Sequence, residues 1–150
     1  MAARENRLRA GKTIAVVRAL ALRQAECHAI GSHRAVEDAG RGVEAARIGL
    51  QTAEGAWQNA INAKGWFDPA IASLFGSDVM RGVDGVVDAQ DALDDRHVQA
   101  GDADALWSTA LAQDRLAAEH VVAEQRRARL RMEARQTLDL DDLWRMRTAL

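Results

Sequence analysis

Apolar residues recur every seven positions through the first 60 residues of the chain. Those at the first position of each heptad, position a, are Leu22, Ala29, Val36, Val43, Leu50 and Trp57. Those three residues later, at position d, are Ala25, Ser32, Ala39, Ala46, Ala53 and Ala60. Apolar a and d rows form a narrow stripe that one helix buries against another, and small d residues let the backbones approach closely. The pattern predicts a long helix packed against a long partner helix.

The second half of the chain repeats this spacing. Its a row is Val79, Val86, Leu93, Ala100, Trp107, Asp114, Val121 and Ala128. Its d row is Phe75, Gly82, Ala89, Arg96, Ala103, Ala110 and Ala117. Large a residues again alternate with small d residues, so we expect this half to supply the partner helix.

One clear break separates the two helical patterns, between Lys64 and Pro69. Gly65 is suited to ending a helix, and Asp68 followed by Pro69 is typical of a helix start. We expect one helix to end near residue 63 and the next to begin near 69. The predicted fold is an all-α, single-domain, antiparallel two-helix coiled-coil hairpin over residues 1–150, with a short C-terminal extension. With the turn near 64–69, the numbers of facing residues add to about 133, which places Leu50 beside Val83.

Glycines offer an alternative architecture. Gly31 and Gly101 face each other in this register, and glycine inside a helix costs about 1 kcal/mol relative to alanine. Breaks at both positions would give a four-helix bundle. The heptad phase passes both glycines without a shift, so the hairpin is favoured.

Composition changes this picture little. The chain has 150 residues, a net charge of −2, one proline and no tyrosine. Its single cysteine, Cys27, cannot form an intramolecular disulfide, which favours a reducing compartment. Arg18 interrupts the apolar run from Ile14 to Leu22, so we expect neither a signal peptide nor a membrane span.

The charges are sorted along the chain. Residues 68–104 contain nine aspartates and only two cations, Arg81 and Arg96. Arginines crowd residues 4–18 and 126–135, which meet at one end of an antiparallel hairpin. Two solvated faces are one interpretation, and a basic end that docks into an acidic partner is the other. No nucleic-acid-binding motif accompanies the basic end.

Sequence signatures of catalysis are absent. Gly11-Lys12-Thr13 lacks the preceding glycine of a phosphate-binding loop, where Asn6 stands. No glutamate has a histidine three residues later, as di-iron helical bundles require. We therefore expect no enzymatic activity, no cofactor and no metal.

Two apolar clusters lie outside the heptad rows. Trp66 and Phe67 occupy the predicted turn, where they either close the tip of the hairpin or bind a partner. Near the C-terminus, Leu140, Leu143 and Trp144 share one helical face. This end either folds back on the hairpin or binds a partner helix.

The layout resembles the FliJ/YscO family. The resemblance is carried by the two-helix architecture, the Arg-rich final stretch and the terminal signature Leu140, Asp141, Asp142 and Leu143. It implies a cytoplasmic component of a bacterial type III export apparatus, with the flagellar system favoured, peripherally associated with the inner membrane. Members act as a stalk in the export ATPase ring, contact the export gate membrane protein and escort substrate chaperones. Neither nucleic acid nor direct membrane insertion is expected.

The resemblance also suggests residues for each partner. The expected contacts of the ATPase hexamer are Arg4, Arg7, Arg9, Arg126, Arg127, Arg129, Arg131 and Arg135. Those of the export gate are Leu50, Trp57, Trp66, Phe67, Phe75 and Val79. Two other functions remain open: a phasin-like protein that coats storage granules, and a structural coiled coil that pairs its seam between chains.

Overall fold

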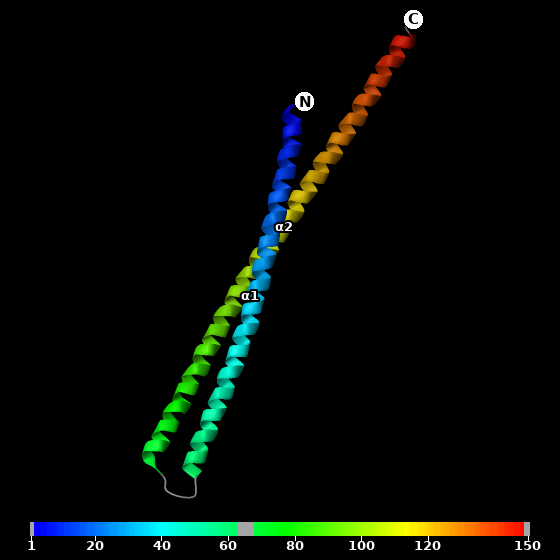
Figure 1. Ribbon diagram of the computed structural model, residues 1–150. Helices are drawn as coiled ribbons and strands as arrows, with labels where there is room; N and C mark the ends of the chain where they lie inside the picture. The colour runs from blue at the N-terminus through cyan, green and yellow to red at the C-terminus, as the bar shows by residue number, and fades with distance from the viewer. Residues whose placement is uncertain (1, 63–67, 149–150) are drawn as a thin grey trace. The chain divides into compact units, whose positions relative to one another are not determined.

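The computed structural model describes residues 2–62 and 68–148, which form two helices. Helix α1 spans Ala2–Asn62 and helix α2 spans Pro69–Thr148 (Figure 1). The described residues contain no strand, and the two helices pack against each other in opposite directions, which confirms the predicted helical hairpin. Gly31 and Gly101 both lie inside unbroken helix, so the four-helix alternative is not adopted.

Helix α2 begins as its sequence predicts. The backbone N–H of Ala70 donates a hydrogen bond to the Asp68 Oδ1 atom at 2.9 Å. The N–H of Ala72 bonds to the Asp68 carbonyl oxygen at 3.0 Å and closes the first turn. Asp68 is therefore the N-cap and Pro69 the first helical residue, where the missing N–H of proline is harmless. The predicted stop at Gly65 lies outside the described residues.

The contacts divide the chain into two units, each built from a segment of α1 and a segment of α2. Residues 26–106 form one, called here the central unit. Residues 1–25 and 107–150 form the other, called here the terminal unit. Both are antiparallel helix pairs.

The seam of the central unit follows the predicted rows. Its most buried side chains are Ala29, Val43, Ala100 and Ala103, which are 1–6% exposed. Most other a and d residues are half-buried, while Trp57 is 38% exposed and Arg96 lies in solvent. The core is therefore a narrow row of small side chains, as the alanine-rich d rows predict.

The terminal unit has a seam of its own, which begins earlier on α1 than the predicted rows. On α1, Leu8, Gly11 and Ala15 are half-buried, two heptads before Leu22. A Cβ atom built on Gly11 would lie 3.8 Å from Cγ2 of Val121 on α2. On α2 the half-buried a row ends at Val121, whereas Ala128 is exposed, so the predicted row is one heptad too long there.

Contacts within each unit establish the register. The numbers of contacting residues add to 132 for Leu50 and Gly82, and to 133 for Trp57 and Gly76. In the terminal unit they add to 132 for Gly11 and Val121. These values match the predicted register. They also show that the seam is filled within one chain.

Candidate functional site

The two units carry opposite charge. The terminal unit holds fourteen arginines and lysines against eight acidic residues, a net charge of +6. The central unit holds six against fourteen, a net charge of −8. The small net charge of the whole chain therefore conceals one strongly basic unit and one strongly acidic unit.

Much of the basic charge lies on an exposed stretch of α2, residues 126–135, which we call the basic segment. Its arginines are Arg126, Arg127, Arg129, Arg131 and Arg135. Every side chain from residue 125 to residue 141 is exposed. Helices in water are stabilised mainly by packing an amphipathic face. A stretch exposed on all sides is therefore a candidate for contact with another molecule.

One arginine of the basic segment is engaged within its own helix. Arg127 Nη1 donates a hydrogen bond to Glu124 Oε1 at 2.8 Å. This hydrogen bond lowers the pKa of the Glu124 carboxyl, against a smaller opposing effect of desolvation. Within the described residues, Arg126, Arg129, Arg131 and Arg135 form no ion pair, so their charges are available to a partner.

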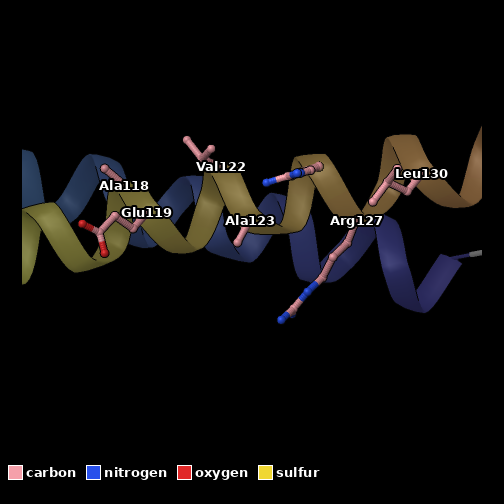
Figure 2. A pocket seen from close by; sticks show the side chains of 7 residues that line it. Ala118, Glu119, Val122, Ala123, Arg127 and Leu130 are labelled. Atoms are coloured by element: carbon pink, nitrogen blue, oxygen red, sulfur yellow. The ribbon is translucent and has the colours of Figure 1, made fainter.

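A shallow hollow of about 500 Å³ lies along α2 at the start of the basic segment (Figure 2). Val122 and Leu130 supply much of its apolar lining and are 63% and 56% exposed. Arg126 and Arg127 also line it, and the other lining residues are Ala118, Glu119 and Ala123. Because all seven come from one helix, the hollow is a surface suited to a side chain of a partner and is not an enclosed catalytic cleft.

The terminal unit also contains the arginines of α1. The side chains of Arg7 and Arg9 are exposed, as is that of Lys12, while that of Arg4 lies outside the described residues. Both predicted arginine-rich stretches therefore belong to the same unit.

The residues expected to contact an export gate have varied environments. Leu50, Phe75 and Val79 are half-buried positions of the seam. Trp57 is a partly exposed seam residue, and a Cβ atom built on Gly76 would lie 3.8 Å from its Nε1 atom. Trp66 and Phe67 lie outside the described residues. Packing between the helices thus accounts for Leu50, Phe75 and Val79 without a partner.

The C-terminal signature lies on the same helix as the basic segment. Helix α2 continues without a break to Thr148, so this end does not fold back on the hairpin. Leu140 and Asp141 are exposed, and Trp144 is 72% exposed. The side chains of Asp142 and Leu143 lie outside the described residues.

Two polar contacts across the seam were not predicted. Arg18 donates a hydrogen bond to Gln113 in the terminal unit. In the central unit, His33 Nε2 lies 3.0 Å from Asp104 Oδ1. The predicted register brings the residues of both pairs close together. Their contacts could not be predicted, because they depend on the rotamers of long polar side chains.

Among the described residues, no three His, Cys, Asp or Glu side chains gather as a metal site would require. Neither described helix has a stretch both long and apolar enough to cross a bilayer. Cys27 is exposed.

Comparisons with known proteins add no assignment. The chain matches no family model, no curated protein and no solved structure.

Proposed function

We propose that this protein is a non-catalytic component of a bacterial type III export apparatus, with the flagellar system favoured. In this proposal the terminal unit enters the export ATPase ring and acts as its stalk. The observation that carries the proposal is the exposed basic segment of α2. It presents five arginines on a stretch of helix, residues 125–141, in which every side chain is exposed.

Charge supports the choice of the terminal unit as the ring-binding part. A ring with an acidic lumen attracts the unit of net charge +6 and repels the unit of net charge −8. The opposite charges of the two units would thus set the direction of insertion. Arg7 and Arg9 of α1 extend the basic surface of the same unit.

The proposal includes two further partners. An export gate in the membrane would hold the protein at the inner membrane from the cytoplasmic side, and Trp57 is the exposed seam residue we assign to it. Substrate chaperones would bind the hollow beside Val122 and Leu130, because exposed apolar side chains flanked by arginine suit an amphipathic helix.

ATPase stimulation tests the stalk function. The purified export ATPase from the same organism is assayed with and without this protein. The triple variant R127E/R129E/R131E should abolish the stimulation, because it reverses three charges of the basic segment.

The matched control reverses three exposed arginines of the central unit, R34E/R41E/R47E. It makes the same change in net charge and should leave stimulation intact. Equal stimulation by the wild type and the basic-segment variant would refute the stalk function.

A further inference from the structure

The first turns of α1 have a second surface that faces away from the seam. The half-buried residues there are Leu8, Gly11, Ala15, Ala21, Leu22 and Ala25. At about 100° per residue, the opposite side of the helix is centred on Thr13, Val17 and Leu20. We call the exposed residues on this side, with Ile14 and Val16 at its edges, the outer face.

The outer face is apolar although it lies in solvent. Ile14, Val16, Val17 and Leu20 are between 55% and 60% exposed. Single exposed aliphatic residues are ordinary on proteins, but here four lie within seven positions on one side of a helix. Such a contiguous patch marks a binding surface.

The charges around this patch all have one sign. Residues 7–25 contain four arginines and one lysine and no acidic residue. On the helix surface Lys12 and Arg23 lie along the edge of the outer face next to Val16, and Arg7 lies along the edge next to Ile14. Arg9 lies in line with Val16 and Leu20, nearer the N-terminus. Arg18 belongs to the seam, where it contacts Gln113. Cations that flank an apolar strip on both sides are the arrangement of a helix that lies in the surface of an anionic bilayer.

We propose that the outer face of α1 binds the surface of an anionic lipid bilayer. The helix would lie parallel to the membrane with Val16, Val17 and Leu20 among the acyl chains nearest the headgroups. The flanking arginines and lysine would reach the lipid phosphates, because their long stems can lie along apolar surface while the charge stays in water. The seam residues would still pack against α2, because they lie on the other side of α1.

The apolar strip favours lipid over nucleic acid as the ligand. A phosphate backbone attracts cations, but it offers no apolar environment in which exposed valine and leucine could be buried. The surface of an anionic bilayer favours both kinds of side chain, because burial of apolar area and attraction to anionic headgroups both contribute to binding. This inference does not rest on the proposed export function. Arg7 and Arg9 serve in both proposals, but binding to vesicles involves neither the basic segment of α2 nor any partner protein.

Vesicle flotation with the full-length protein tests the proposal. Vesicles of phosphatidylcholine and phosphatidylglycerol should carry the protein upward, and pure phosphatidylcholine vesicles should carry much less. The variant V17Q/L20Q should weaken the apparent affinity at least ~10-fold, because it removes two side chains from the acyl region. The variant R9Q/K12Q should weaken it by about 30-fold at low ionic strength.

The matched control is V87Q/V98Q, which makes the same kind of change at exposed residues of the acidic central unit. It should float like the wild type, and all variants should keep the wild-type circular dichroism melt. No flotation, flotation independent of phosphatidylglycerol, or flotation unaffected by V17Q/L20Q would each overturn the proposal. Duplex DNA binding that is lost in R9Q/K12Q, without vesicle binding, would overturn it in favour of nucleic acid.

Discussion

Gly82 lies against the backbone of Leu50 in the central unit. A Cβ atom built on Gly82 would be 3.1 Å from Leu50 Cδ1 and 3.3 Å from Leu50 Cα. The Cα atom belongs to the backbone of α1, so it cannot move aside as a side chain can. Among the glycines of the described residues, Gly82 is therefore the one at which the absence of a side chain lets the two helices approach most closely.

This contact predicts opposite effects for two glycine substitutions. Gly31→Ala should stabilise the protein by about 1 kcal/mol, because alanine favours helix and a Cβ at Gly31 would meet nothing within 4 Å. Gly82→Ala gains the same propensity but loses about 1–3 kcal/mol to overpacking. Thermal melts of both variants should place G31A above the wild type and G82A at or below it. An equal rise for both would contradict the close approach at Gly82.

The N-cap of α2 should also be measurable. Asp68→Ala removes the acceptor of the Ala70 N–H bond and should cost about 1 kcal/mol, whereas Asp68→Asn should cost much less. Asp91→Ala, at an exposed aspartate inside α2, is the control and should change stability by less than ~0.5 kcal/mol. Urea unfolding followed by circular dichroism measures all three. A loss in D91A equal to that in D68A would argue against the capping role.

Burial predicts which apolar side chains stabilise the fold. Val43 is 4% exposed, and Val43→Ala should destabilise the protein by about 1–3 kcal/mol. Leu138 is 65% exposed, and Leu138→Ala should change stability by less than ~0.5 kcal/mol. Comparison of the two melting temperatures decides the matter, and a larger loss in L138A would mean that the exposed stretch of α2 packs in solution.

The pair of Glu124 and Arg127 predicts a pH dependence. The hydrogen bond from Arg127 lowers the pKa of Glu124 below its ordinary value of 4.5. A carboxyl whose pKa is lower in the folded state stabilises that state at every pH above its pKa in the unfolded chain. The stabilisation is lost as the pH falls through the pKa of the folded state. Nuclear magnetic resonance titration of the Glu124 side chain should show the lowered pKa, and Arg127→Gln should raise it. An unchanged pKa in R127Q would show that the bond does not form in solution.

The heptad rows predicted most of the fold. The positions of Val43, Ala100 and Ala103 in the seam followed from their spacing, and the start of α2 followed from Asp68 and Pro69. Leu50 meets Gly82, one residue from the position expected. These features were predictable because burial of one stripe and the capping of one helix end are local requirements of the sequence.

Other features depended on what the partner helix offers. On α1 the seam begins at Leu8, because α2 is long enough to cover this residue. The sequence pattern did not show it, because the d positions there are Gly11 and Arg18. Ala128 is exposed although it continues the a row. The aliphatic outer face of α1 was not predicted. In the sequence Val16, Val17 and Leu20 belong to one apolar run with the seam residues, and only the structure shows which side of the helix α2 covers.

A disulfide trap tests the antiparallel register of the central unit, on which the assignment of its seam residues depends. Cβ of Leu50 lies 3.5 Å from a Cβ atom built on Gly82, within the range that disulfides span. In a chain with Cys27→Ala, the pair Leu50→Cys and Gly82→Cys should oxidise to a monomeric cross-linked species, detected by mass and by non-reducing electrophoresis. The pair Leu50→Cys and Gly85→Cys should not, because a Cβ at Gly85 meets nothing within 4 Å. A cross-link that forms only between chains, or equally in both pairs, would contradict the intrachain hairpin.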